Sequence, residues 1–347
     1  MTEGPVLFDI PRDLITWEPS DAPVVSCYVD WSTSGRGLHE ASTVVRHDLR
    51  EALRGVLERG EAHASLEADV ARIERFLAEE ADAAAKAFAI FACDARGLWE
   101  VFTLGVELPT RVHAGERPLL LPLIESTQDA ARTLVVLADT NTARFFRLSP
   151  SGAVEAEGPH RSTATVKHST KGGWGAIGYQ RHVDLEVYRF AEEVARDAER
   201  LMAERNLGHL VLAGDEVIVP PLTAALSQGT RERLDAAEHI DIRAALSEVE
   251  HRIWPEVAEI VRARRARETE AILGRVEAGR NAVGEPASTL EALEAGRVYE
   301  LAIDPDVLEE EVAELAVRQA LAHRSRVLVE RGHEALAARG GLAATLR

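Results

Sequence analysis

The chain has 347 residues, of which 46% are apolar, and its 40 Lys and Arg against 58 Asp and Glu leave a formal net charge of −18. At roughly 100 to 200 residues per domain, this length predicts two or three globular domains. The longest apolar runs are far shorter than the roughly 20 residues that cross a bilayer, and residues 1–10 lack the basic and apolar regions of a signal peptide. We therefore expect a cytoplasmic protein with no membrane partner.

The acidic composition also disfavours non-specific binding to nucleic acid, because that affinity comes mainly from neutralising phosphates. Any RNA contact is therefore expected to be local. Cys27 and Cys93 both lie in apolar runs and form no CxxC pair, so we expect buried free thiols. No His/Cys cluster has the spacing of a zinc site, and neither a metal nor a cofactor is expected.

Residues 1–127 form the first segment, in which strand and helix patterns follow an irregular, proline-rich start. Apolar runs predict strands, and helical spacing of apolar residues predicts helices. The expected elements are a buried strand over 24–30, helices over 38–58 and 64–85, and hairpin strands over 87–92 and 99–104 about a turn at 94–97. We predict an N-terminal α+β domain that ends at the polar stretch 125–129.

Residues 130–280 form the second segment, whose alternating strands and helices are typical of an α/β layered domain. Residues 158–178 are rich in Gly, Ser, Thr, His and Lys and predict a long exposed loop. The other expected elements are strands over 133–138 and 143–148, a short strand after the turn 149–152, a helix over 180–206, a strand over 209–213, a helix that starts at Pro220, and an almost unbroken helix over 242–280 with a kink or boundary at Pro255.

Residues 281–347 form a short third segment that predicts a small α/β sandwich. Its expected elements are helices over 289–295 and 308–322 and strands over 297–303 and 326–330. The tail 340–347 is expected to close the sheet as a last strand.

The window 160–182 differs from the rest of the chain in charge. Asp and Glu are 58 of 347 residues, so 23 residues should hold roughly four acids, yet this window holds none. Two of only three lysines, Lys167 and Lys171, lie in it, together with Arg161, Arg181 and three histidines. A basic, glycine-containing loop on an acidic protein predicts an anionic partner such as RNA or a phosphate; a solvated loop with no partner is the alternative.

Gly173, Gly175 and Gly178 match the GxGxxG spacing of a dinucleotide-binding turn. That turn requires a strand that runs directly into the glycines and an acidic residue at the end of a second strand about 20 positions later. Here the preceding residues 166–171 are polar and basic, and the acidic residues about 20 positions on fall inside the expected helix. A nucleotide-binding oxidoreductase is therefore the alternative from another class, and a strand running directly into the glycines would favour it.

A family resemblance covers more of the chain. Residues 171–182 read KGGWGAIGYQRH. Gly-Gly-Trp followed by a short run and Tyr-Gln-Arg is closely similar to a motif in the bacterial branch of the archaeo-eukaryotic class I release factor and Pelota superfamily. The order of elements in 130–280 resembles the middle domain of that superfamily, and 281–347, including the closing GGLAATLR, resembles its L7Ae-like C-terminal domain. The segment 1–127 is similar only to the bacterial relatives.

The resemblance implies a multidomain α/β and α+β fold, with an RNase H-like middle domain followed by an L7Ae-like α/β sandwich. It implies a ribosome-binding translation factor that occupies the A site with the loop at 160–182, in rescue, release or hibernation. The expected partners are rRNA and the tRNA acceptor end of the ribosome, with a translational GTPase as a further candidate. The residues implied in RNA binding are Arg161, Lys167, His168, Lys171, Gly172, Gly173, Trp174, Gln180, Arg181 and His182.

The same resemblance raises the alternative of a peptidyl-tRNA hydrolase. In eukaryotic release factors this loop carries Gly-Gly-Gln, which positions the water that attacks the peptidyl-tRNA ester. Consecutive glycines let the backbone approach RNA closely, and backbone N–H groups can stabilise an oxyanion. Gly172, Gly173 and Trp174 are the catalytic candidates. Because Trp174 stands where the Gln carboxamide would be, we favour binding, in which the indole stacks on a base.

The remaining candidates have simpler structural interpretations. Asp139 and Asp215 each follow an expected strand, where turn or cap roles are favoured. His160, His168 and His182 share one loop, which supplies no fixed geometry for a metal.

A basic run lies on the expected long helix, at Arg262, Arg264, Arg265 and Arg267. At about 100° per residue these side chains circle the helix, which favours a solvated helix with ion pairs over an RNA-binding stripe. The expected acidic partners are Glu256, Glu259, Glu268 and Glu270.

Overall fold

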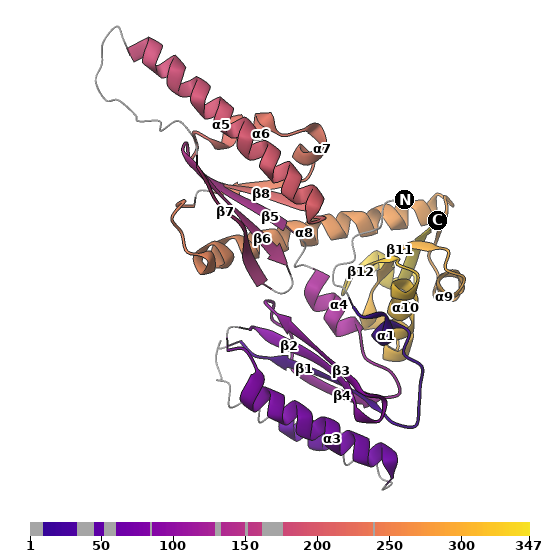
Figure 1. Ribbon diagram of the computed structural model, residues 1–347. Helices are drawn as coiled ribbons and strands as arrows, with labels where there is room; N and C mark the ends of the chain where they lie inside the picture. The colour runs from indigo at the N-terminus through magenta and orange to yellow at the C-terminus, as the bar shows by residue number, and fades with distance from the viewer. Residues whose placement is uncertain are drawn as a thin grey trace. The chain divides into compact units, whose positions relative to one another are not determined.

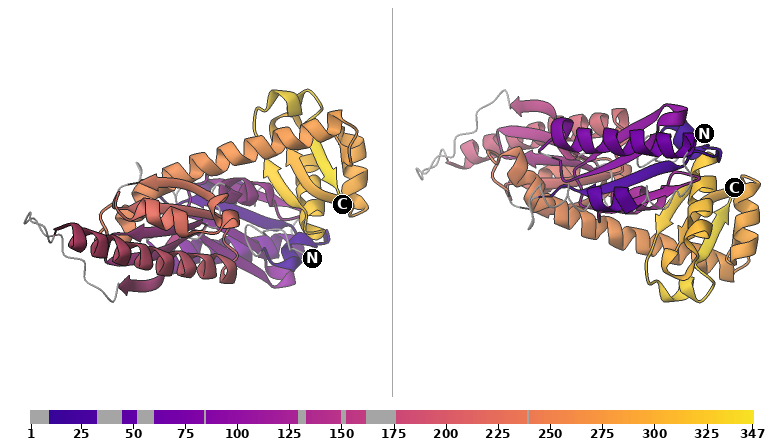
Figure 2. Two further views of the ribbon diagram at one scale, coloured as in Figure 1. Left: turned by 90° about the horizontal axis from the view of Figure 1, so that it is seen from above. Right: turned by 90° about the horizontal axis from the view of Figure 1, so that it is seen from below.

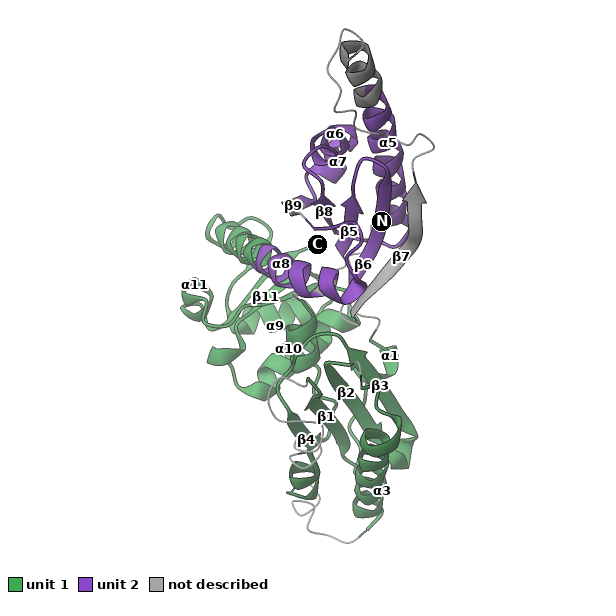
Figure 3. Cartoon of the chain, turned by 90° about the vertical axis from the view of Figure 1, so that its left-hand side faces the viewer, with its two compact units in different colours: residues 1–128, 263–347 green, residues 129–262 purple. Residues whose placement is uncertain are grey.

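The computed structural model describes residues 10–32, 45–51, 60–83, 85–128, 133–149, 152–161, 176–238 and 240–347. Side chains are described within these ranges except at 149, 152–161, 176–184, 235–238 and 250. The chain forms two compact units (Figure 3). Unit 1 comprises residues 1–128 and 263–347, and unit 2 comprises residues 129–262. The first and third sequence segments thus share a unit, and the three-domain division at 127 and 280 remains a prediction.

The N-terminal part of unit 1 is an antiparallel sheet in the order β3-β2-β1-β4 (Figure 1). Its strands are β1 (Val24–Asp30), β2 (Ala87–Cys93), β3 (Leu98–Leu104) and β4 (Arg111–Gly115). Alternate residues of β1 and β2, such as Val25 and Ile90, pack against Leu66 and Ile73 of α3 (Glu61–Arg75). The predicted buried strand and hairpin are therefore confirmed.

The helices of this part differ from the prediction in two places. The expected helix over 64–85 stops at Glu80, since a π-helical turn (Phe76–Glu80) closes α3. Of the expected helix over 38–58, residues 45–51 are helical and the rest lies outside the described residues. Three short elements were not predicted from the sequence: β4, α1 (Arg12–Ile15) and α4 (Leu121–Gln128).

Unit 2 is built on a mixed sheet in the order β7-β6-β5-β8-β9. β5 (Thr133–Ala138), β8 (His209–Gly214) and β9 (Leu234–Glu238) are parallel, whereas β6 (Thr142–Ser149) and β7 (Gly152–Arg161) extend it antiparallel. Helices α5 (Ala176–Glu204) and α6 (Val219–Ala225) follow β7 and β8. The short helix α7 (Gln228–Arg231) precedes β9.

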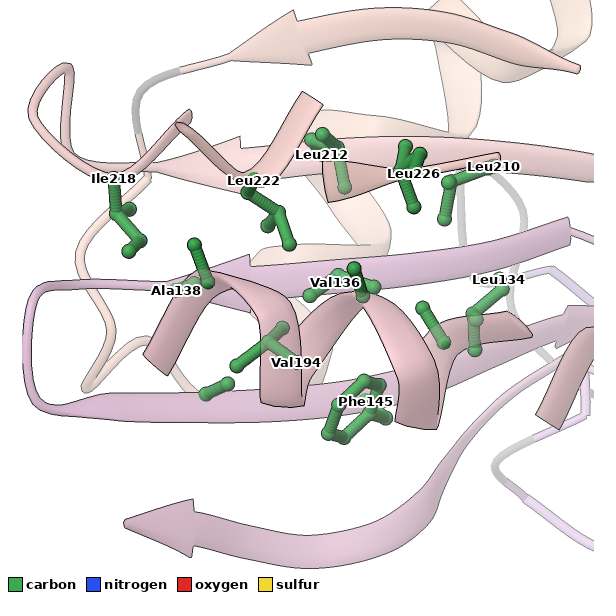
Figure 4. Packing of buried hydrophobic residues seen from close by; sticks show 14 of the residues in the cluster. Leu134, Val136, Ala138, Phe145, Val194, Leu210, Leu212, Ile218, Leu222 and Leu226 are labelled. Atoms are coloured by element: carbon green, nitrogen blue, oxygen red, sulfur yellow. The ribbon is translucent and has the colours of Figure 1, made fainter. Parts of the chain in front are cut away.

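The sheet of unit 2 has an apolar core on each face. On one face, Val136, Phe145 and Leu212 meet α5 and α6 through residues such as Val194 and Leu222 (Figure 4). On the other face, alternate residues of β5, β6 and β8 pack against the first half of α8 (Leu246–Glu277). Buried strands with both faces covered read as continuous apolar runs, which is why β5 and β8 could be predicted.

The C-terminal part of unit 1 is a four-stranded sheet in the order β10-β13-β11-β12. Its strands are β10 (Ala282–Val283), β11 (Val298–Ile303), β12 (Arg326–Val329) and β13 (Leu342–Leu346), and its helices are α9 (Pro286–Glu294), α10 (Glu310–Ala322) and α11 (Glu334–Ala337). The tail closes the sheet beside β11, as predicted. The helix α8, drawn in orange in Figure 2, leads into this part. It continues through Pro255, so the predicted helix boundary at that residue is wrong.

Buried polar groups hold the two parts of unit 1 together. Glu314 on α10 accepts hydrogen bonds from the backbone N–H groups of Leu120 and Leu121 at 2.8 and 2.7 Å, and so caps the start of α4. One turn later, Arg318 donates to the backbone carbonyls of Leu14, Ile15 and Pro118. We call these contacts the polar seam. The sequence gives no local sign of α4 because its cap comes from a residue almost 200 positions away.

A second set of contacts extends the polar seam at α4. The side-chain amide of Gln128 donates to the carbonyl of Val329 at 3.0 Å and accepts from the N–H of the same residue at 3.0 Å. Arg331 pairs with Glu125 of α4 and Asp306. The stretch 125–129, which looked like the end of a domain, is for the most part a helix fastened to the C-terminal sheet.

Candidate RNA-binding site

The basic loop joins an edge strand to a long helix. β7 pairs along one side with β6 and reaches Arg161, and α5 begins at Ala176. The expected loop over 158–178 was therefore too long at both ends, because residues 158–161 continue the pairing with β6 and residues 176–178 belong to α5. Residues 162–175 lie outside the described part of the chain.

The predicted RNA-binding residues fall into two groups. Arg161 is the last residue of β7, and Gln180, Arg181 and His182 lie in the second turn of α5. The other six, from Lys167 to Trp174, lie outside the described residues: Lys167, His168, Lys171, Gly172, Gly173 and Trp174. The described backbone therefore places four of the ten at the two ends of the loop.

The N-terminal end of α5 carries no acidic residue in its first turn, so its exposed N–H groups and helix dipole favour an anion there. At about 1.5 Å per residue the helix is roughly 44 Å long. Its described apolar stripe begins at Val187 and continues through Val194 to Met202 on the sheet. The loop is therefore followed by a helix whose later turns pack in the core of unit 2.

Two apolar residues of α5 fall outside that buried stripe. Leu185 and Tyr188 are 48% and 58% exposed, although Val187 and Phe190 beside them are buried. Arg189 is also exposed and pairs with Glu186 at 3.0 Å. Neither Leu185 nor Tyr188 was identified from the sequence. Both fall outside the helical spacing of the buried residues of α5, and that spacing could have indicated that they are exposed.

The strand nearest before the glycine stretch in the described part of the chain is β7. β7 ends at Arg161, eleven positions before Gly172, and it is an antiparallel edge strand. Asp197 lies inside α5, where it pairs with Arg200 at 3.3 Å, and Glu199 accepts from the N–H of Ser227. Because residues 162–175 lie outside the described part of the chain, the nucleotide-binding alternative stays a prediction; the positions of Asp197 and Glu199 inside α5 do not favour it.

Asp139 and Asp215 have the turn and cap roles that the sequence predicts. Asp139 accepts from the N–H groups of Asn141 and Thr142, both at 2.7 Å, and Asp215 accepts from the N–H of Val217 at 2.9 Å. β8 ends at Gly214, whose φ is +140°. A Cβ there would lie 1.8 Å from the carbonyl oxygen of Ala138.

The basic run on α8 has different partners from those expected. Arg262 pairs with Glu259, as predicted. Arg265 is buried, however, and pairs with Glu330 at 2.7 Å, so it does not belong to a solvated face. Two of the expected glutamates also pair elsewhere, Glu268 with Arg326 at 2.6 Å and Glu270 with His333 at 3.2 Å. One side of this half of α8 is therefore fastened to the C-terminal part of unit 1, whereas Arg262, Arg267 and Glu270 are exposed.

The two cysteines are buried and unbridged, as predicted. Burial raises the pKa of Cys27 to about 12, with a smaller contribution from Asp48, so its nucleophilic thiolate form is disfavoured. Within the described ranges, no three His, Cys, Asp or Glu side chains are grouped to hold a metal ion. None of the described helices is both long and apolar enough to span a membrane.

Comparison with known proteins gives a family for the region around the loop. Residues 118–257 match the family described as bacterial archaeo-eukaryotic release factor family 10, and this range includes the whole window 160–182. Over this range the match confirms the family predicted from the Gly-Gly-Trp motif and the order of elements. No curated protein matches the chain.

Solved structures of the superfamily align with most of the chain. The archaeal termination factor aRF1 is 16% identical, with a TM-score of 0.30, and the match covers 97% of this chain and 95% of aRF1. An archaeal Pelota, described bound to the ribosome with ABCE1, is 20% identical, with a TM-score of 0.47 and 72% of each chain covered. Dom34 of S. cerevisiae is 12% identical, with a TM-score of 0.43, 75% of this chain and 79% of Dom34 covered.

Proposed function

We propose that this protein is a cytoplasmic ribosome-binding factor that occupies the A site through the loop at 160–182, in rescue, release or hibernation. The single observation that carries the proposal is the release factor family match over 118–257, which spans this loop. Release factors act on peptidyl-tRNA, so the tRNA acceptor end and nearby rRNA are the proposed partners. A translational GTPase is proposed as the protein that delivers it.

The charge of the loop supports this role. The window 160–182 contains no acid, while the whole chain has a net charge of −18. Contacts to phosphate must therefore be concentrated there, and Lys167 and Lys171 are the proposed central cations. The acid-free first turn of α5 adds a favourable potential at the C-terminal end of the loop.

Trp174 favours binding over hydrolysis. An indole offers a flat face for stacking on a base, and it lacks the carboxamide with which Gln positions water in the eukaryotic factors. A hydrolase would use the backbone N–H groups of Gly173 and Trp174 to stabilise an oxyanion. The two candidate activities therefore differ in whether peptide is released from the ribosome.

Co-sedimentation with empty and tRNA-loaded ribosomes tests the binding. The variant is Lys167→Glu/Lys171→Glu, and the matched control is Arg231→Glu/Arg233→Glu, the same charge reversal at two exposed arginines of unit 2. We expect wild type and control to bind at low salt, the loop variant to bind at least about tenfold more weakly, and all binding to weaken steeply as salt rises.

Equal binding by the loop variant, or no binding by wild type, would overturn the proposal. Release of labelled peptide from stalled ribosomes then separates the two candidate activities. Binding without release supports a non-catalytic factor. Release by wild type that Gly173→Ala abolishes would show a hydrolase instead.

A further inference from the structure

A second basic surface lies on the C-terminal sheet of unit 1, in the part of the chain that follows the family match. Three segments converge there, 295–299, 315–329 and 335–347, and none of them contains Asp or Glu. Their exposed residues at one end of β11 are Arg297, Tyr299, His323, Arg324 and Arg347. We call these five residues the β11 patch.

Direct contacts fix the β11 patch in place. The backbone N–H of Arg347 donates to the carbonyl of Arg297 at 2.8 Å, and its guanidinium donates to the carbonyls of Val298 and His323. The ring of His323 packs against Gly296, where a Cβ would lie 2.9 Å from the imidazole Nδ1. Three chain segments therefore present their cations on one rigid framework.

Tyr299 is the aromatic member of the β11 patch. The pairing of β11 with β13 shifts register between Val298 and Glu300, so Tyr299 sits at a β-bulge. Val298 is fully buried, whereas the side chain of Tyr299 is 52% exposed. Bulges redirect side chains and are common beside functional sites. An aromatic ring held open to solvent offers a stacking surface that a structural role in the core would not require.

The acidic residues nearest in sequence to Arg297 and Tyr299 are Glu291, Glu294 and Glu300. Glu291 of α9 lies 3.8 Å from Arg297, and both side chains are exposed, so water screens this pair strongly. Glu300 pairs with Arg326, which lies outside the β11 patch and also pairs with Glu268. The β11 patch itself contains three arginines and no acid, on a chain whose net charge is −18.

We infer that the β11 patch binds single-stranded RNA, with arginines on phosphates and Tyr299 stacked on a base. Cations around an exposed aromatic ring are the combination with which proteins hold single strands without sequence preference. The inference deepens the proposed function by adding an RNA contact in unit 1, and it rests on different residues from those of the loop.

Fluorescence anisotropy of a labelled 12-nucleotide RNA, measured with the full chain at low salt, tests this inference. Arg297→Glu/Arg324→Glu should weaken binding at least about tenfold and flatten the dependence on salt. Tyr299→Ala should weaken binding about tenfold, while Tyr299→Phe should retain it, because a phenyl ring still stacks. The matched control is Arg12→Glu/Arg75→Glu, a charge reversal at two exposed arginines of the N-terminal part of unit 1.

The two variants Tyr299→Ala and Tyr299→Phe test the inference even where the charge reversal alters folding. Unchanged RNA binding by both Tyr299→Ala and the arginine variant would overturn the inference. Displacement of the RNA by poly-glutamate as effectively as by unlabelled RNA would also overturn it, since the surface would then recognise acidic protein. The loop variant Lys167→Glu/Lys171→Glu, tested in the same anisotropy assay, separates the two sites. Loss of RNA binding in the loop variant, with unchanged binding in the β11 patch variants, would overturn the inference.

Discussion

The core of unit 2 and the polar seam of unit 1 hold their parts together by different physical means. In unit 2, buried aliphatic and aromatic residues cover both faces of one sheet. At the polar seam, Glu314 and Arg318 are more than nine-tenths buried and bind backbone groups of distant segments. An apolar core tolerates small losses of contact, whereas a buried charge that loses its partner has no replacement. The polar seam should therefore tolerate fewer kinds of substitution than the apolar core, and single substitutions can test that difference.

The largest effect is expected in the core of unit 2. Phe145 of β6 is fully buried in the core between the sheet and α5, and Phe145→Ala should lower the free energy of unfolding by about 4 kcal/mol, because it leaves a cavity. Urea unfolding gives the size of the loss, and hydrogen exchange should show it in unit 2. Faster exchange confined to unit 1 would contradict this assignment.

A slightly smaller effect is expected at the polar seam. Glu314→Ala leaves the N–H groups of Leu120 and Leu121 without their acceptor and Arg318 without its neighbouring charge, which should cost about 3 kcal/mol. Hydrogen exchange should rise at α4 and α10. The control is the double variant Glu314→Ala/Arg318→Ala beside both single variants: if the polar seam is a coupled pair, the loss in the double variant should be clearly smaller than the sum of the single losses.

Arg265 and Arg262 of α8 allow the same substitution to be compared at a buried and at an exposed ion pair. Arg265→Ala leaves the nearly buried carboxylate of Glu330 unpaired and should cost about 2 kcal/mol. Arg262→Ala removes an exposed pair with Glu259 and should cost less than about 0.5 kcal/mol. Thermal unfolding of both variants measures the difference. Equal effects would mean that burial does not decide the strength of these pairs.

The smallest expected effect is the pH dependence of the contribution of Glu314 to stability. Burial raises the pKa of Glu314 from 4.5 to about 7, against the lowering effect of its bonds to Leu120 and Leu121. The folded protein thus keeps this proton where the unfolded chain releases it, so the contribution of Glu314 to stability falls as pH rises from about 4.5 to 7. Glu314→Gln does not titrate.

The difference in Tm between wild type and Glu314→Gln should therefore shift in favour of the variant between pH 4.5 and 7. Burial also raises the pKa of Asp69 to about 7, but Asp69 is present in both proteins and cancels in the difference. A Tm difference that stays constant over this range would contradict the raised pKa of Glu314.

Local patterns in the sequence predicted the elements that pack by apolar contact. β1, β5 and β8 are buried on both faces and read as unbroken apolar runs, and α5 carries its apolar stripe at helical spacing. The family was also predictable, because the motif at 171–182 and the order of elements are both local in the sequence.

Features that depend on distant partners were not predictable. α4 begins where a carboxylate from α10 reaches its first N–H groups, and Arg265 finds its partner on the C-terminal sheet. Neither is encoded in neighbouring residues. At the candidate site, charge counting identified the loop, but it could not indicate that β7 continues to Arg161 or that Tyr188 is exposed on α5.

The bond between Gln128 and Val329 has a consequence beyond joining two segments. β12 is an edge strand of the C-terminal sheet, and the outward N–H and C=O of Val329 are its accessible pairing groups at that point. An open edge of this kind can recruit a strand from another molecule and start aggregation. The amide of Gln128 occupies both groups and imitates one residue of a neighbouring strand. At Val329 the edge of β12 therefore offers no unpaired groups to a strand of another molecule.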